Sequence, residues 1–155
     1  SEKVLELYSG AGMLTAFLAQ RALELTAVEI NSDAVADMVV NLADLDNVIL
    51  YHGLVEEVLA SIESQPDLLV VDPGRTGLAK PVIAQIETIA PPRLVYVGSD
   101  LARTARDSKA LTEAGYSLVK VQPLDMRPQT YHVDTVSLWG KTKNGKRNGV
   151  ASLHI

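Results

Sequence analysis

Three short segments carry side chains that could perform acid–base or nucleophilic chemistry. Asp72-Pro73-Gly74-Arg75 places a carboxylate and a guanidinium around a rigid turn, directly after an apolar run. Gly98-Ser99-Asp100 offers a hydroxyl, and His132-Val133-Asp134 offers an imidazole and a carboxylate. Each segment alone also fits a plainer role: a capped turn, a helix N-cap or a solvated surface pair. Because all three lie at ends of predicted strands, we interpret them together as one site.

A glycine-containing turn near the start of the chain supplies a candidate ligand site. An apolar run over residues 4–8 stops at Ser9, and Gly10-x-Gly12 leads into apolar residues at helical spacing from Leu14 to Ala22. Two glycines let the backbone turn tightly and approach a ligand, while the following helix offers unpaired N–H groups. Thr15 stands where the dinucleotide fingerprint needs a third glycine, which disfavours a nicotinamide cofactor.

Two acidic residues make the prediction of the ligand at this turn more specific. Glu6 lies on the strand before the glycines, and Glu29 ends the next apolar run, at a spacing where a carboxylate accepts hydrogen bonds from ribose hydroxyls. An acidic residue followed by Gly-x-Gly is the pattern of strands that bind S-adenosylmethionine (SAM). The alternative is an ordinary strand–turn–helix corner with solvated acids.

Composition limits what the chain can be. Its 155 residues, 47% hydrophobic, fit one globular domain, and no apolar run approaches the length of about 20 residues that spans a bilayer. With no cysteine, disulfides and thiolate metal sites are excluded, and a cytoplasmic location is expected without a membrane or metal partner. The net charge of −5 argues against general electrostatic binding of nucleic acid. A strand so near the first residue suggests a piece of something longer.

Strands and helices alternate along the chain. Strands are predicted at residues 4–8, 25–28, 48–51, 67–72, 93–97, 116–124 and 133–139, and helices at 14–22, 34–43, 55–62, 82–89 and 102–114. This order predicts an α/β fold: a doubly wound seven-stranded sheet with a ligand crevice at the carboxyl ends of the strands. The link between the last two strands carries no helix, so the last strand is expected to run antiparallel beside the sixth.

The end of the chain is predicted to lie outside this domain. We assign residues 1–141 to the domain and 142–155 to a basic loop and the C-terminal end. The basic, glycine-containing stretch 141–149 is expected to form a solvated hairpin, with a phosphate contact as the alternative.

The chain resembles the SAM-dependent RNA 5-methyluridine (uracil-C5) methyltransferases over nearly its whole length. The motifs that carry the resemblance are residues 6–12, Val28-Glu29, Asp72-Pro73-Gly74-Arg75-x-Gly77, 95–97 with 105–108, Ala114-Gly115-Tyr116 and Leu124-Asp125-Met126-x-Pro128-x-Thr130-x-His132. The resemblance implies a Rossmann-like class I methyltransferase fold, SAM as cofactor and rRNA or tRNA as substrate. It also implies RNA-binding domains upstream, which this sequence does not contain.

The resemblance also implies a reaction and the residues for it. In the family a cysteine thiolate adds to C6 of uracil, the enolate attacks the methyl group of SAM, and a carboxylate removes the C5 proton. Ser99 stands at the cysteine position and Asp134 at that of the glutamate base, with His132 as a candidate to activate Ser99. The implied cofactor-binding residues are Glu6, Tyr8, Gly10, Gly12, Glu29 and Asp72, and the implied RNA contacts are Arg75 and Arg106.

Four residues depart from the family pattern. Besides Ser99 and Asp134, Leu54 replaces a polar adenine contact and Leu101 replaces a proline after the nucleophile. A serine hydroxyl needs a dedicated base where a thiolate does not. Three hypotheses follow: an RNA methyltransferase, a SAM-binding module that methylates poorly or not at all, and an interaction domain with neither ligand.

Overall fold

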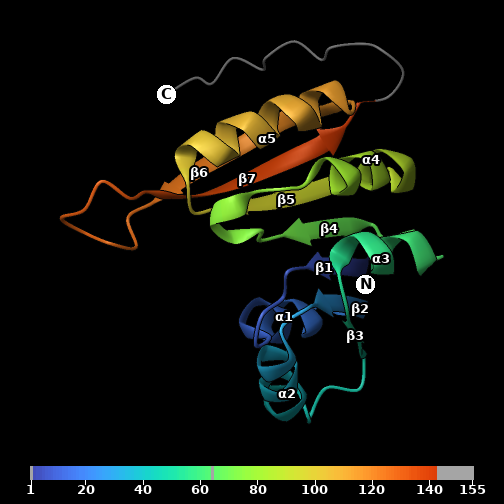
Figure 1. Cartoon of the computed structure of the whole chain (residues 1–155). Helices are drawn as coiled ribbons and strands as arrows, with labels where there is room; N and C mark the ends of the chain where they lie inside the picture. The colour runs from blue at the N-terminus through green and yellow to red at the C-terminus, as the bar shows by residue number, and fades with distance from the viewer. Residues whose placement is uncertain (1, 64, 143–155) are drawn as a thin grey trace.

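The computed structural model describes residues 2–63 and 65–142, which form a seven-stranded sheet with helices on both faces (Figure 1). The elements are β1 (Glu2–Leu7), α1 (Met13–Ala19), β2 (Ala22–Glu29), α2 (Ser32–Asn41), β3 (Val48–His52), α3 (Val55–Ser61), β4 (Leu68–Val71), the 3-10 turn η1 (Gly74–Thr76), α4 (Lys80–Ile89), β5 (Arg93–Gly98), α5 (Leu101–Glu113), β6 (Tyr116–Leu124) and β7 (Asp134–Lys141). The predicted α/β class is confirmed. The stretch 143–155, which includes most of the predicted basic loop, lies outside the described residues.

The strand order β3-β2-β1-β4-β5-β7-β6 confirms the doubly wound sheet. Strands β1 to β5 run parallel, and the chain order reverses between β1 and β4, where such sheets bind ligands at the carboxyl ends. The last strand, β7, is antiparallel to β6 as predicted. It also pairs with β5, so it lies between β5 and β6.

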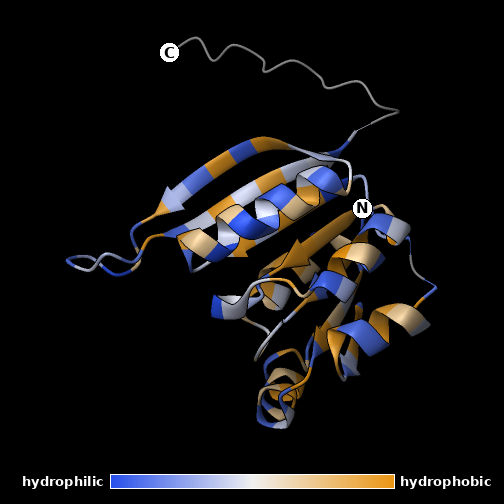
Figure 2. Ribbon diagram, turned by 45° about the horizontal axis from the view of Figure 1, so that its top comes forward, coloured by the Kyte–Doolittle hydropathy of each residue, from blue (hydrophilic) through white to orange (hydrophobic). Residues whose placement is uncertain are grey.

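Two apolar clusters hold the layers together. Leu5, Leu7 and Val71 on one face of the sheet pack with residues of α3, α4 and α5, and Val4 and Leu25 on the other face pack with residues of α1 and α2. Figure 2 shows the central strands as mainly hydrophobic and the loop between β6 and β7 as mainly hydrophilic. No helix in the described parts of the chain is long and apolar enough to cross a bilayer.

The first helix is shorter than predicted. Apolar residues at helical spacing suggested a helix up to Ala22, but α1 ends at Ala19 and Ala22 begins β2. The Asn47 side chain donates hydrogen bonds to the carbonyl oxygens of Ala19 and Ala22, at 2.8 and 3.1 Å, and so closes the turn. The local sequence pattern fits either a longer helix or the start of a strand, and these tertiary contacts favour the strand.

Candidate functional site

The loop after β1 is shaped by its two glycines. Gly12 has φ 86°, and a Cβ there would lie 2.8 Å from Cγ of Met38 on α2, so only glycine fits. Gly10 has φ 57°, but a Cβ there would meet nothing within 4 Å. Gly12 therefore serves the packing of the loop on α2, whereas Gly10 borders open space that a ligand can enter.

Glu29, at the end of β2, ties that loop to the next one. Its Oε2 accepts a hydrogen bond from the Gly10 N–H at 2.8 Å, and its Oε1 accepts from the N–H groups of Ile30 (2.9 Å) and Asn31 (2.8 Å). The sequence suggested a contact from this carboxylate to ribose. The structure adds that three backbone N–H groups already hold it, which fixes its position at the crevice.

A cavity of about 180 Å³ opens beside Glu29, at the carboxyl ends of the first strands. Ile30 and Leu54, which are 54% and 45% exposed, lie on its wall. Its lining comes from the carboxyl ends of four strands and the segments that follow them: Tyr8, Val28, Glu29, Ile30, Leu54, Val55, Glu56, Thr76, Gly77 and Ala79. Burial raises the pKa of the Tyr8 phenol to about 12, with the Glu56 and Asp107 carboxylates adding to the effect, so this ring stays neutral.

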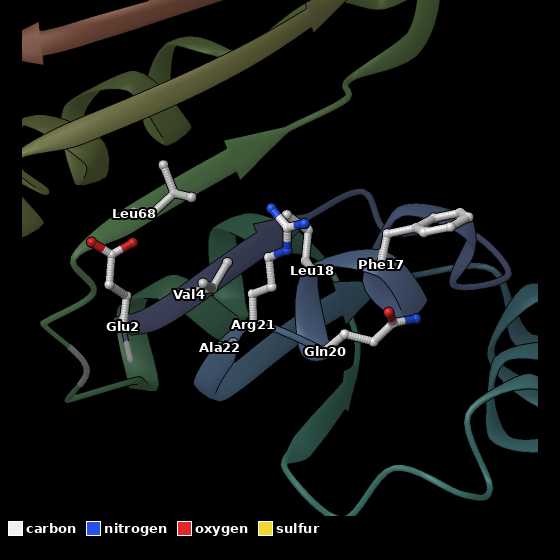
Figure 3. A pocket seen from close by; sticks show the side chains of 8 residues that line it. All are labelled: Glu2, Val4, Phe17, Leu18, Gln20, Arg21, Ala22 and Leu68. Carbon is white, nitrogen blue, oxygen red and sulfur yellow. The ribbon is translucent and has the colours of Figure 1, made fainter.

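A larger cavity of about 430 Å³ lies elsewhere and contains none of the predicted site residues. Figure 3 shows Val4, Leu18 and Leu68 among its lining, with the Arg21 guanidinium next to Leu18, Glu2 at one side and Phe17 at the other. It borders the amino-terminal half of β1 and the end of α1. In a doubly wound sheet this is the end away from the ligand crevice.

Glu6, which is buried, and Asp72, which is half-buried, form an acidic pair beside the glycine loop. Burial raises the pKa of Glu6 from 4.5 to about 7; the nearby Thr15 hydroxyl lowers it and the Asp72 charge raises it. Burial also raises the pKa of Asp72, which the Gly74 N–H lowers and the Asp134 charge raises. Among the described residues, no hydrogen bond reaches Glu6 Oε2 or the Thr15 hydroxyl. An orphaned buried carboxyl oxygen next to an open glycine loop fits a cationic or hydrogen-bond-donating ligand.

The β5–β7 ladder brings Ser99 and Asp134 together. Gly98, the last residue of β5, pairs with Thr135 in antiparallel register, so Ser99, directly after β5, and Asp134, the first residue of β7, come next to the last paired residues at the same end of the two strands. Arg127 forms an ion pair with Asp134, with 2.7 Å between Nη2 and Oδ1. Within the described residues no hydrogen bond to the Ser99 hydroxyl is formed.

His132 does not join this pair through a hydrogen bond. Its ring lies against that of Tyr131, with 4.3 Å between the centroids and 36° between the planes. Its backbone N–H donates to the Thr130 hydroxyl at 3.3 Å. Activation of Ser99 by His132 stays a prediction that this geometry does not support.

The two predicted RNA-contacting arginines differ in their surroundings. Arg75 lies exposed in η1. Arg106 is engaged: Nη2 donates to the carbonyl oxygens of Thr76 and Leu78, and the guanidinium pairs with Asp107 at 2.6 Å. Arg106 therefore anchors the loop after β4, whatever its contact with RNA.

Asp107 is a residue whose importance sequence reasoning missed. It is fully buried, and its Oδ2 accepts hydrogen bonds from the Leu78 N–H (2.7 Å) and the Tyr96 hydroxyl (2.8 Å). A Cβ on Gly77 would lie 2.4 Å from the same oxygen. The spacing of Asp107 four residues before Leu111, on the buried side of α5, is the signal that could have revealed it.

Comparison with known proteins places the chain among RNA methyltransferases. It is 35% identical over 152 residues to the 23S rRNA (uracil(1939)-C(5))-methyltransferase RlmD of Photobacterium angustum, covering 95% of this chain and 69% of the relative. It is 38% identical over 146 residues to an uncharacterized RNA methyltransferase of Enterococcus faecalis, covering 91% of this chain and 32% of the relative. The chain spans about a third of the length of this protein and of several other curated relatives that it matches. No family model matches it.

A solved structure agrees with these relatives. The tRNA (uracil-54, C5)-methyltransferase of Pyrococcus abyssi, in complex with S-adenosyl-L-homocysteine, superposes with a TM-score of 0.80 at 29% identity, covering 90% of this chain and 34% of that chain. The structural match and the sequence relative RlmD are both uracil-C5 methyltransferases of RNA. This chain belongs to the family of RNA uracil-C5 methyltransferases.

Proposed function

We propose that this chain is the SAM-binding catalytic domain of an RNA uracil-C5 methyltransferase, acting on rRNA or tRNA in the cytoplasm. The observation that carries the proposal is the β5–β7 register, whose last pair, Gly98 with Thr135, is adjacent to Ser99 and Asp134 at the edge where the glycine loop and Glu29 also lie. A nucleophile position, a base position and a cofactor crevice thus share one edge of the sheet.

The cofactor crevice fits SAM in several respects. Glu29 is held where its carboxylate can accept from ribose hydroxyls, and Ile30 and Leu54 offer apolar walls for an adenine ring. The unpartnered Glu6 oxygen and Asp72 lie beside the glycine loop, where a positively charged methionine group would be favourable. SAM, when bound, supplies the electrophilic methyl group.

The reacting residues favour a weak or absent methyl transfer in the chain as it stands. An unassisted serine hydroxyl is far less nucleophilic than a thiolate, and Ser99 has no hydrogen-bonded base among the described residues. Asp134 is one methylene shorter than glutamate and is paired with Arg127. A SAM-binding module with impaired catalysis is therefore the second candidate function. It is supported by the ion pair between Asp134 and Arg127 and by the serine at position 99.

Two measurements on the same proteins separate the candidates. Calorimetric titration should show SAM binding by the wild type, weakened by Glu29→Ala by about 1.5 to 3 kcal/mol because a charged hydrogen-bond acceptor is lost. Methyl transfer from labelled SAM to uridine-containing RNA should be low in the wild type. It should rise most in the double variant Ser99→Cys and Asp134→Glu, since both groups act on one intermediate.

Specific outcomes would exclude one or both candidate functions. Absence of SAM binding would exclude both the methyltransferase and the SAM-binding module. Strong transfer by the wild type that Ser99→Ala abolishes would show that a base such as His132 activates the hydroxyl. Glu87→Gln, an exposed change on α4, is the control for both measurements.

A further inference from the structure

An exposed aromatic side chain stands next to the proposed reacting residues and has no assigned role. Tyr131, in the loop between β6 and β7, is 88% exposed. Figure 1 shows this loop projecting beyond the end of the sheet. Burying an aromatic ring is favourable, so a tyrosine held in solvent on a projecting loop suggests a partner that covers it.

The loop that carries Tyr131 contains a hydrogen-bonded turn. The Thr130 N–H donates to the Arg127 carbonyl at 3.2 Å, closing a turn with Pro128 second and Gln129 third. Gln129 has φ 65°, as the third position of a type II turn requires, and proline is favoured at the second. The Thr130 hydroxyl donates to the same carbonyl at 2.7 Å. A preordered loop loses little entropy when its side chains bind a partner.

The same loop is fastened to the proposed site. The ion pair of Arg127 with Asp134 joins the turn to the first residue of β7, next to the residue that pairs with Gly98. Tyr131 is three residues from Asp134 in the chain. A group that stacks on Tyr131 would therefore lie close to a nucleotide at Ser99, as a neighbouring base in the same strand does.

The surroundings of Tyr131 favour a nucleobase over a protein partner. The loop is mainly hydrophilic (Figure 2), and Met126 and Tyr131 are its exposed large hydrophobic side chains, so it offers a flat aromatic face and no wide apolar patch of its own. One face of the ring lies against His132, which orients it. Arg75 and Arg103, exposed in the loop after β4 and at the start of α5, form no ion pair with a carboxylate in the described ranges and are available to phosphates.

We infer that Tyr131 is a stacking platform for an unpaired RNA base adjacent to the nucleotide that enters the site. The inference rests on the proposed function for its choice of RNA as the ligand. Aromatic rings at such positions bind single-stranded nucleic acid by stacking with little dependence on sequence. The platform would help to hold a splayed single-stranded segment, which a domain with net charge −5 cannot hold by charge alone.

Binding of a short labelled oligouridylate to the full chain at low salt, followed by fluorescence anisotropy, tests the inference. Tyr131→Ala and Tyr131→Leu should weaken binding about tenfold, the order expected for one lost base stack, whereas Tyr131→Phe should stay within about twofold of wild type. Phe17→Ala is the matched control, because Phe17 is 70% exposed but lies at the other cavity. A thiouridine-substituted RNA should cross-link to Tyr131.

The dependence on salt separates stacking from charge. Tyr131→Ala should leave the slope of log affinity against log salt unchanged, whereas Arg103→Gln should lower it by about 1. Wild-type binding that Tyr131→Ala leaves intact, or no RNA binding or cross-link by the wild type, would overturn the inference. So would a Tyr131-dependent change in self-association without one in RNA binding. Tyr131-dependent RNA binding without SAM binding would instead refute only the proposed function.

Discussion

Glu6 should make the protein less stable as the pH rises, and its neutral analogue should remove that effect. The side chain is 2% exposed, and its pKa is raised from 4.5 to about 7 chiefly by burial. Below pH 4.5 the carboxyl is protonated in both the folded and the unfolded chain. Between pH 4.5 and 7 the unfolded chain loses this proton while the folded chain keeps it, so the free energy of unfolding falls as pH rises.

The size of the effect follows from the two pKa values. At about 1.4 kcal/mol per pH unit, the interval from 4.5 to about 7 corresponds to a loss of roughly 3 kcal/mol by pH 8. Glu6→Gln carries no charge in either state and keeps almost the same volume. We therefore expect it to be close to wild type in stability at pH 4.5 and more stable by roughly 3 kcal/mol at pH 8.

Urea unfolding at the two pH values measures this difference. Trp139 is the single tryptophan of the chain and is buried, so its fluorescence reports unfolding. Glu87→Gln, on the exposed side of α4, should show no such dependence on pH. A gap between Glu6→Gln and wild type that is the same at pH 4.5 and at pH 8 would refute the argument that burial suppresses ionisation of Glu6.

Two further predictions concern the loops around the site. Gly77→Ala should lower the free energy of unfolding by about 1 to 3 kcal/mol more than Gly74→Ala in thermal melts; both glycines have positive φ, but only at Gly77 would the new Cβ collide, with Asp107. Equal losses would show that Asp107 can move away. Asn31→Ala should cost about 1 kcal/mol because its side chain caps α2, whereas Asn31→Asp should keep the cap; a loss with both would point to another role.

Most of the fold could be predicted because its signals are local. Apolar runs separated by Gly, Pro and Asn mark the strands, and the alternation with helical spacing predicts a doubly wound sheet. Gly12 is required by its positive φ, which the sequence pattern already indicated. The end of α1 could not be predicted, because residues 19–22 suit either a helix or a strand. The hydrogen bonds from the Asn47 side chain, which fix the turn between α1 and β2, come from a distant segment.

The site was predicted less completely because it depends on contacts between distant segments. The approach of Ser99 and Asp134 requires β7 to lie beside β5, a contact across more than thirty residues that no local pattern specifies. The ion pair of Arg127 with Asp134 and the burial of Asp107 are likewise products of the assembled fold. Spacing of residue types located the strand ends, and only the folded chain shows which of them meet.

The position of β7 between β5 and β6 bears on how the protein folds during synthesis. β6 joins the sheet only through β7, so residues 116–124 have no strand partner until residues 134–141 have left the ribosome. Until then Leu118, Val119 and Val121 lie on an unpaired strand beside an incomplete sheet. Pairing of residues 134–141 with β5 also places Asp134, at the start of β7, at the carboxyl end of β5, so this end of the sheet is incomplete until that segment has been synthesised.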